Sequence, residues 1–311
     1  SVVFFGTPQF AVPTLDALCR DSRFWVKLAV TQPQRPAGRG RAVCACPVEQ
    51  KAQEHHIPIL SPVSLRRETR EFLAQAKLSG PFDIGVVIAF GQILPEEVLM
   101  LPEQGCVNLH ASLLPRWRGA APIQRAIMAG DVQTGMCLMK MEKGLDSGPV
   151  YSRASVDILP SETFGELHDR LSDLADKLCL RDLESIAKGS LPANLQEREG
   201  ATYAAKITPE EALIDWSGEA ADIERQIRGL SPQPAAFCWL GGKRLKILRA
   251  AAREALPPDQ QHMCHVDSHG IEVACGTGVL ALTELQLEGR KKLPVAEFLR
   301  GVDLAVGQAL K

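Results

Sequence analysis

An asparagine and a histidine two residues apart are the first side chains in this sequence that could do chemistry together. They close the segment Gly105-Cys106-Val107-Asn108-Leu109-His110, which has the composition of a strand. Side chains alternate along a strand, so Asn108 and His110 share one face about 6.5–7 Å apart. An amide and an imidazole that converge on one small group suit an oxygen that gains negative charge. The spacing alone fits equally well two residues that end a strand with hydrogen bonds to the next loop.

A carboxylate between two glycines is the second candidate. It is Asp146 in Gly144-Leu145-Asp146-Ser147-Gly148. Glycines permit a tight turn that can approach a ligand closely, although an aspartate between glycines is most often a simple turn residue. If Asp146 faces His110, its charge favours the protonated imidazole. The amide, the charged imidazole and the carboxylate then form a site for acyl transfer.

Several other chemistries lack their motifs. The turn after the first strand has no GxGxxG, and neither a phosphate-binding Walker loop nor a GxSxG elbow occurs. These absences disfavour nicotinamide binding, phosphate-loop catalysis and a serine hydrolase. Cys106 could lie on the face of His110, but its apolar neighbours favour a packed thiol over a nucleophile.

The nine cysteines form no CxxC pair, which suggests free thiols in a reducing compartment. Cys44 and Cys46 are a weak metal signal without a second pair. The group His262, Cys264, His265 and His269 fits no zinc spacing and follows a proline-rich stretch that reads as a loop. We therefore expect no metal.

The elements that position the candidates are alternating strands and helices. The clearest helix runs from Glu162 to Lys188, with Ser161 as its cap and Gly189 as its stop. Continuously apolar strands between helices predict a mostly parallel sheet covered on both faces, with ligands at the carboxyl ends of the strands. The predicted strands are Val2–Phe5, Val26–Val30, Ile84–Ala89, Gly105–His110 and Thr134–Met141.

In the second half of the chain the strand–helix alternation gives way to short strands separated by turns. A helix is expected from Glu219 to Arg228, and turns at Gly241-Gly242 and Gly276-Thr277-Gly278 separate short strands. We predict a catalytic domain at 1–189, a linker at 190–208 and a small β-barrel or sandwich at 209–311. The longest strongly apolar run, Ile84 to Gly91, is far shorter than the ~20 residues of a membrane span.

One stretch is strongly basic although the net charge of the chain is only −2. No acidic residue occurs between Asp21 and Glu49, and the segment Thr31–Arg41 is too rich in proline and glycine for a helix. We expect a mobile basic loop beside the strand ends. Such a loop suits a phosphate backbone or is simply solvated. In the second half Lys243-Arg244-Leu245-Lys246 is a local basic cluster.

Taken together, these motifs resemble a known family. Val107–Pro115, followed by Arg116-Trp117-Arg118-Gly119-Ala120-Ala121-Pro122-Ile123, is similar to the signature of the folate-dependent formyltransferases. Gly144–Gly148 resembles their second motif, with Ser147 where threonine is more usual. Three further features resemble the methionyl-tRNA formyltransferases within the family. They are Phe5-Gly6-Thr7-Pro8, the Thr31–Arg41 loop, and Ile214-Asp215-Trp216-Ser217 with Ile227-Arg228 and Pro232-Gln233-Pro234.

The resemblance implies transfer of a formyl group from 10-formyltetrahydrofolate to the amino group of methionyl-initiator tRNA, with Asn108, His110 and Asp146 at the catalytic positions. It implies a Rossmann-like domain followed by an oligonucleotide-binding-like barrel, in a monomer of the bacterial cytoplasm with no membrane partner. Folate contacts are expected from Ser112, Leu113, Leu114, Pro115, Ile88, Phe90 and Ile93. Contacts with tRNA are expected from Arg35, Arg39, Arg41, Lys243 and Lys246.

Two alternatives stay open at this point. A sibling enzyme could formylate a small amine, and a non-catalytic module could bind tRNA or folate. Gln233 stands where tryptophan is usual, and the loop from Arg41 to Pro47 is less basic than in similar proteins, so the detailed tRNA contacts are the part that the resemblance constrains least.

Overall fold

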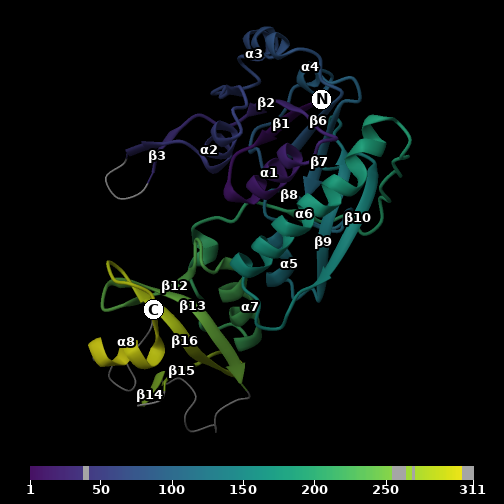
Figure 1. Cartoon of the computed structure of the whole chain (residues 1–311). Coiled ribbons are helices and arrows are strands. Elements are labelled where there is room, and N and C mark those ends of the chain that lie inside the picture. Colours follow the sequence, from purple (N-terminus) through teal and green to yellow (C-terminus); the bar gives the residue numbers. More distant parts are fainter. Residues whose placement is uncertain (38–41, 254–263, 268–269, 303–311) are drawn as a thin grey trace. The chain divides into compact units, whose positions relative to one another are not determined.

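A seven-stranded sheet forms the first half of the protein in the computed structural model, which describes residues 1–37, 42–253, 264–267 and 270–302 (Figure 1). The strand order is β10-β9-β7-β6-β1-β2-β5. Its strands are β1 (Val2–Gly6), β2 (Val26–Val30), β5 (Ile59–Leu60), β6 (Ile84–Ile88), β7 (Cys106–His110), β9 (Gln133–Lys140) and β10 (Val150–Asp157). The pairs β1–β2, β1–β6, β2–β5 and β6–β7 are parallel, whereas β9 runs antiparallel to β7. The predicted mostly parallel sheet is confirmed.

The strand order changes direction beside β1. From β1 the chain builds β2 and β5 on one side, and later adds β6 and β7 on the other. Every residue of β1 and β6 is buried, because helices cover both faces of a parallel sheet. Phe5 anchors one layer of this core, since its ring meets the Phe90 ring edge-on at 5.6 Å between centroids. The switch point therefore lies between β1 and β6, with β7 next to β6, and open parallel sheets bind ligands at the carboxyl ends of the strands there.

Helices separate most of these strands along the chain, as predicted, and further helices lie in the second half. They are α1 (Val12–Arg20), α2 (Pro47–Glu54), α3 (Thr69–Ala76), α4 (Glu96–Leu99), α5 (Pro122–Met128), α6 (Phe164–Ala187), α7 (Ala220–Leu230) and α8 (Val295–Gly301). Short 3-10 turns occur at Gln9–Ala11, Lys77–Ser79 and Glu210–Ala212.

The start of the long helix α6 differs from the prediction. The helix begins at Phe164, and Thr163 rather than Ser161 caps it, because Thr163 Oγ1 accepts a hydrogen bond from the Glu166 N–H (3.4 Å). Glu166 Oε2 in turn accepts from the Thr163 N–H (2.9 Å), which completes a reciprocal capping box. At the other end Gly189 adopts φ +67° and stops the helix, as predicted.

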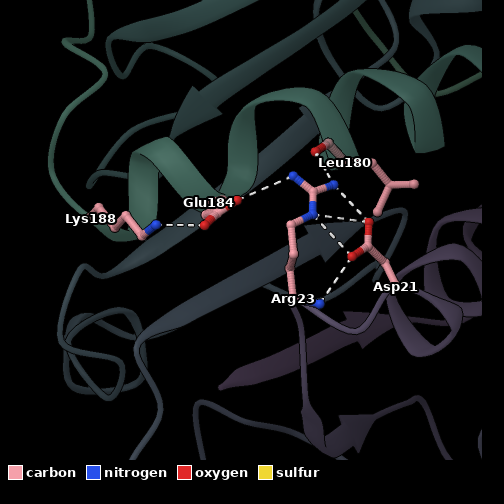
Figure 2. A network of polar contacts seen from close by, with 5 residues as sticks. All are labelled: Asp21, Arg23, Leu180, Glu184 and Lys188. Atoms are coloured by element: carbon pink, nitrogen blue, oxygen red, sulfur yellow. Dashed lines mark hydrogen bonds and ion pairs between the residues drawn. The ribbon is translucent and has the colours of Figure 1, made fainter.

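A polar network ties the C-terminal part of α6 to the turn after α1 (Figure 2). The guanidinium of Arg23 donates to the Leu180 carbonyl (3.0 Å) and to a Glu184 carboxylate oxygen (3.3 Å), while Asp21 accepts on its other side (2.7 Å). Hydrogen bonds from Arg23 lower the pKa of Asp21. A planar guanidinium can serve these three partners at once, which explains an arginine at this position.

The second half is built around an antiparallel sheet in the order β12-β13-β16-β15-β14, with β17 beside β16. The strands are β12 (Ala236–Leu240), β13 (Lys243–Arg253), β14 (Cys264–Asp267), β15 (Gly270–Ala274), β16 (Val279–Leu287) and β17 (Leu293–Pro294). The predicted turns are confirmed, since Gly241 and Gly242 have φ of +54° and +78° and join β12 to β13 as a two-residue hairpin. The fold class is thus a Rossmann-like sheet followed by a small antiparallel β domain, as predicted.

The division of the chain into compact units is discontinuous. One unit comprises 1–119, 134–156 and 168–203, and the other 120–133, 157–167 and 204–311. The predicted linker begins at 190, but residues up to 203 belong to the first unit because they hydrogen-bond to it. Val150 and Asn194 exchange two backbone hydrogen bonds (2.8 and 2.9 Å). Among the helices of the described residues, none combines the length and apolar character needed to cross a membrane.

The basic segment after β2 contains a short hairpin instead of a plain loop. Strands β3 (Arg35–Ala37) and β4 (Ala42–Cys44) pair antiparallel, and residues 38–41 between them lie outside the described residues. The described residues of the segment, 31–37, form no helix, as expected. Two very short strands, β8 (Arg118–Gly119) and β11 (Tyr203–Ala204), pair elsewhere in the chain.

Candidate active site

Asn108 and His110 lie at the carboxyl end of β7, next to β6 on one side and β9 on the other. Strand alternation places the two side chains on one face, as the sequence predicts. His110 is buried and Asn108 is half-buried. Within the described ranges no protein group hydrogen-bonds the side-chain amide of Asn108. Its two N–H donors are therefore available to a ligand.

Both ring nitrogens of His110 face a protein partner. Nε2 lies 2.9 Å from the backbone carbonyl of Trp117. Because a carbonyl oxygen only accepts, Nε2 carries a proton and donates. Nδ1 lies 3.7 Å from Oδ2 of Asp146, so the structure brings these two predicted residues together as an ion pair when the ring is charged. The ring is thereby oriented with Nδ1 toward the carboxylate.

The turn that carries Asp146 has an unusual backbone. Asp146 has φ +47°, a region that non-glycine residues seldom occupy, and Gly144 has φ +147°. Gly148 is required for space, since a Cβ there would lie 2.1 Å from the Lys140 carbonyl oxygen. Ala89 and Trp117 also have positive φ, so three of the five such non-glycine residues in the described chain surround this site. Backbone strain of this kind persists only where neighbouring contacts impose it.

The segment Trp117–Gly119 imposes much of this geometry. The Trp117 carbonyl holds His110, and the Gly119 N–H donates to Oδ2 of Asp146 at 2.8 Å. The segment itself is attached to Thr202, which accepts from the Trp117 N–H at Oγ1 (2.9 Å) and from the Arg118 N–H at its carbonyl (2.9 Å). Three consecutive residues thus set the relative positions of the imidazole and the carboxylate.

Gln196 is a residue that the sequence reasoning did not identify. Its Nε2 donates to the carbonyl oxygens of Asp146 (2.8 Å) and Gly148 (2.7 Å), and its Oε1 accepts from the Arg118 guanidinium (2.7 and 3.1 Å). The sequence carries no signal for this role, because a lone glutamine in an aperiodic segment gives neither motif nor periodicity.

The residues expected to contact folate fall into two groups. Ile88, Phe90, Ser112 and Leu114 have buried side chains. The Ser112 hydroxyl already donates to the Arg116 carbonyl (2.6 Å), so its reach toward a ligand is limited to the backbone. The side chains of Leu113 and Pro115 are half-exposed, and Ile93 is 83% exposed. The buried group forms the wall behind the strand ends, and the accessible group remains free for contact.

The residues expected to contact tRNA are only partly described. Arg39 and Arg41 lie outside the described residues, and Arg35 is placed only as part of β3. Lys243 and Lys246 lie on β13, where Lys243 is exposed and Lys246 half-buried. Of the five residues expected to contact tRNA, Lys243 and Lys246 are therefore those whose side chains the structure describes.

The surface around the lysine pair includes aromatic residues that sequence reasoning missed. Trp239 pairs with Arg244, and Phe237 pairs with Lys246, across the β12–β13 hairpin. The Arg244 guanidinium lies 4.2 Å from the Phe237 ring centroid and 5.7 Å from that of Trp239. The sequence did carry a signal for this arrangement. Two aromatic residues at alternate positions precede the Gly241-Gly242 turn, and two basic residues at alternate positions follow it.

The buried thiols of Cys106 and Cys137 are unsuited to nucleophilic catalysis. Burial raises the pKa of Cys106 to about 12 and that of Cys137 to about 11, so both remain protonated near neutral pH. The prediction of a packed Cys106 is confirmed. No three histidine, cysteine or acidic residues come close enough to hold a metal ion in the part of the chain that the structure describes. His262 and His269 lie outside that part.

Comparisons with known proteins place both halves of the chain in one family. The family described as "Formyl transferase" matches residues 1–183, and "Formyl transferase, C-terminal domain" matches residues 206–303. The chain is 45% identical to a methionyl-tRNA formyltransferase of Paraburkholderia phymatum, over 99% of this chain and 96% of the relative. It is 46% identical to one of Cereibacter sphaeroides, over 98% of this chain and 97% of the relative.

Solved structures support the fold. An N-formyltransferase from Helicobacter canadensis, in complex with folinic acid and dTDP-3-aminofucose, superimposes with a TM-score of 0.68 at 15% identity, covering 90% of this chain and 98% of its own. A methionyl-tRNA formyltransferase from Clostridium thermocellum gives a TM-score of 0.53 at 20% identity, covering 81% and 93%. Because both domain patterns and relatives of nearly equal length match along the chain, it belongs to the methionyl-tRNA formyltransferase family.

Proposed function

We propose that the protein transfers the formyl group of 10-formyltetrahydrofolate to the amino group of methionyl-initiator tRNA, as a monomer in the bacterial cytoplasm. The observation that carries the proposal is the cluster at the end of β7. There the unpartnered Asn108 amide and the His110 ring share one face, and Asp146 lies 3.7 Å from Nδ1. The 45% identity to a relative of that name supports the choice of substrates.

The proposed step is a direct attack by the neutral amine on the formyl carbon. A new C–N bond forms, and the carbonyl π electrons move onto the oxygen of a tetrahedral intermediate. When it collapses, the bond to N10 of the folate breaks, and N10 keeps the electron pair and takes up a proton while the amine loses one. No protein nucleophile is needed, which agrees with the buried, protonated Cys106.

Asn108 and His110 supply the donors for the oxyanion in this proposal. The Asn108 amide contributes an N–H. A charged His110 contributes Nδ1–H, because Nε2–H already serves Trp117, whereas Nδ1 lies 3.7 Å from Asp146 Oδ2, too far for a hydrogen bond. Each preorganised donor of this kind typically contributes about 10²–10³ in rate. Asp146 orients the ring and pairs with its charge. Its Oδ2 also accepts from Gly119, so Oδ1 is the atom that can exchange protons through water.

The folate pocket is assigned to the carboxyl ends of β6 and β7. The side chains of Leu113, Pro115 and Ile93 are accessible there, and Ala89, which follows β6 with φ +47°, is exposed. A planar pterin suits such a surface, since exposed backbone groups hydrogen-bond its edge and apolar side chains cover its faces.

For tRNA we propose two contact regions. One is the basic segment of Arg35, Arg39 and Arg41. The other is the surface of the β12–β13 hairpin, which we call the aromatic-basic face and define as Phe237, Trp239, Lys243, Arg244 and Lys246. Within the described residues none of its three cations forms an ion pair, and a hollow of about 260 Å³ lies beside Arg244 and Lys246. Unpaired cations beside an exposed indole suit a phosphate backbone and a base.

The test is a discontinuous transfer assay with the full chain, 10-formyltetrahydrofolate, and either methionyl-tRNA or glycinamide ribonucleotide as the acceptor. We expect formylmethionine on initiator tRNA and no product from the small amine. Product only from the small amine would instead identify a sibling formyltransferase. Binding of tRNA without any transfer would identify a non-catalytic module.

A further inference from the structure

Gln196 contacts the strained turn that carries Asp146, although 50 residues separate the two in sequence. It extends from the irregular segment after α6 and is half-buried. Its amide has two N–H donors and two acceptor lone pairs, and all four are used. The donors go to the Asp146 and Gly148 carbonyls, and the lone pairs accept from Nε and Nη2 of Arg118.

The partners determine which way the amide points. The two carbonyls accept only, so they require the nitrogen, and the guanidinium donates only, so it requires the oxygen. A flipped amide would set its single oxygen against the two carbonyl oxygens and its N–H donors against the guanidinium. Arg118 therefore orients the amide. The amide in turn holds the turn on both sides of Ser147, at the carbonyls of Asp146 and Gly148.

The turn needs such support because of its backbone. A non-glycine residue at φ +47° costs about 1–3 kcal/mol and persists only where contacts impose it. The Gly119 N–H restrains the Asp146 side chain at 2.8 Å, and Gln196 restrains the main chain on which that side chain stands. Together these contacts set the 3.7 Å separation between the carboxylate and His110.

We propose that Gln196 is a positioning residue for formyl transfer: oriented by Arg118, it holds the 144–148 turn so that the Asp146 carboxylate faces Nδ1 of His110. The proposal rests on the proposed function, because the effect of Gln196 reaches the reaction only through Asp146. Misplacing a catalytic group by about 1 Å can cost 10²-fold in rate.

The first test compares Gln196→Ala with Gln196→Glu in the transfer assay. Alanine removes all four hydrogen bonds. Glutamate keeps the acceptors for Arg118 but sets an oxygen against the two carbonyls. We expect both variants to lower kcat by about 10–100-fold, with KM for folate and for tRNA changed less than about 3-fold. If Gln196 only attached its own segment through Arg118, Gln196→Glu would keep wild-type kcat, and that result would overturn the proposal.

The second test is a double-mutant cycle. Because Gln196 acts through Asp146, the variant carrying both Asp146→Ala and Gln196→Ala is expected to be as slow as Asp146→Ala alone. Fully multiplied effects would show that Gln196 acts by another route. Glu197→Ala, an exposed neighbour in the same segment, is the matched control and is expected to keep wild-type kcat.

The activity of the wild-type chain distinguishes a failure of the proposed function from a failure of the role of Gln196. If it transfers no formyl group to methionyl-tRNA, the proposed function fails. If it does transfer the group and Gln196→Ala matches it in kcat, only the role of Gln196 fails. Equal thermal midpoints of the variants show that a loss of rate does not come from unfolding.

Discussion

Charged side chains are held by protein partners in the cluster at the end of β7, whereas those of the aromatic-basic face are left without ion pairs among the described residues. In the cluster His110 has a partner at each ring nitrogen, and Asp146 is restrained at its carboxylate and at its backbone. On the aromatic-basic face the side-chain cations of Lys243, Arg244 and Lys246 form no ion pair among the described residues, although the Arg244 backbone N–H donates to Glu288 Oε2 (3.2 Å). The Arg244 guanidinium rests on aromatic rings.

The difference follows from what each region has to do. A group that stabilises developing charge must already be in place, because reorganisation during the reaction raises the barrier. A group that binds a mobile polyanion gains most when its charge is free to replace counterions. Substitutions in the cluster should therefore change kcat, and substitutions on the aromatic-basic face should change tRNA affinity and its salt dependence.

The largest expected effect is that of His110→Ala. Removing the imidazole takes away one oxyanion donor and the partner of Asp146, so kcat should fall at least 10²-fold. Folate affinity, measured by equilibrium binding, should stay within about 3-fold, because the ring is buried and engaged with protein groups. Preserved turnover with lost folate binding would assign His110 to binding and break the comparison.

Asp146→Asn tests the charge separately from the shape. The amide oxygen can still accept from the Gly119 N–H, so the turn keeps its contact, but the ion pair with His110 is lost. We expect kcat to fall by about 10–100-fold with little change in KM. An unchanged kcat would mean that His110 needs no carboxylate.

On the aromatic-basic face the expected effects are smaller and of another kind. Trp239→Ala should weaken tRNA binding by about 5–100-fold through lost stacking and leave the salt slope unchanged, because the indole is neutral. Arg244→Ala should reduce the slope of log K against log salt by about 0.7–0.9. Filter binding at several salt concentrations measures both quantities.

Two residues serve as matched controls for that experiment. Arg249 lies on the same strand, but its charge is already paired with Glu166, so Arg249→Ala should leave the slope unchanged. Trp25 is 69% exposed in the first unit, so Trp25→Ala should leave tRNA affinity unchanged. Equal losses in the control variants would mean that the aromatic-basic face has no special role.

Local pattern predicted one of these regions better than the other. Period-two alternation placed Asn108 and His110 on one face, and apolar runs separated by helices predicted the parallel sheet around them. The proximity of Asp146 came from the family resemblance, because a glycine-flanked aspartate carries no information about its distant partners. Gln196 escaped detection for the same reason, since its four hydrogen bonds join residues 48–78 positions apart.

The aromatic-basic face was only half predicted. The lysines appear as a basic run, but the match of Trp239 to Arg244 depends on the register of the hairpin. The error at the start of α6 is of a similar kind. Ser161 and Thr163 both precede the helix as possible caps, and only Thr163 stands three residues before an acidic residue, Glu166, that bonds back to it.

The smallest expected effect is a pH-dependent difference in stability between the ion-paired Arg125 and the unpaired Arg244, both in the second unit. Arg125 forms a two-point contact with Glu211 (2.5 and 3.1 Å), and hydrogen bonds from Arg125 are the main cause that lowers the pKa of this carboxyl. A lowered pKa in the folded state means stability that is present above the ordinary value near 4.5 and is lost as pH falls below it. Glu211→Gln should therefore lower the free energy of unfolding by about 0.5–1 kcal/mol at pH 7. It should not change that free energy at a pH low enough to protonate Glu211 in the folded wild type.

Arg244→Gln, which removes an arginine without a carboxylate partner, should show no such pH-dependent loss. Urea unfolding of both variants at pH 7 and at the lowest pH where the wild type stays folded measures the difference. If the Arg244 variant lost stability as pH rose above 4.5, its charge would be structural, and the contrast between paired and unpaired cations would fail.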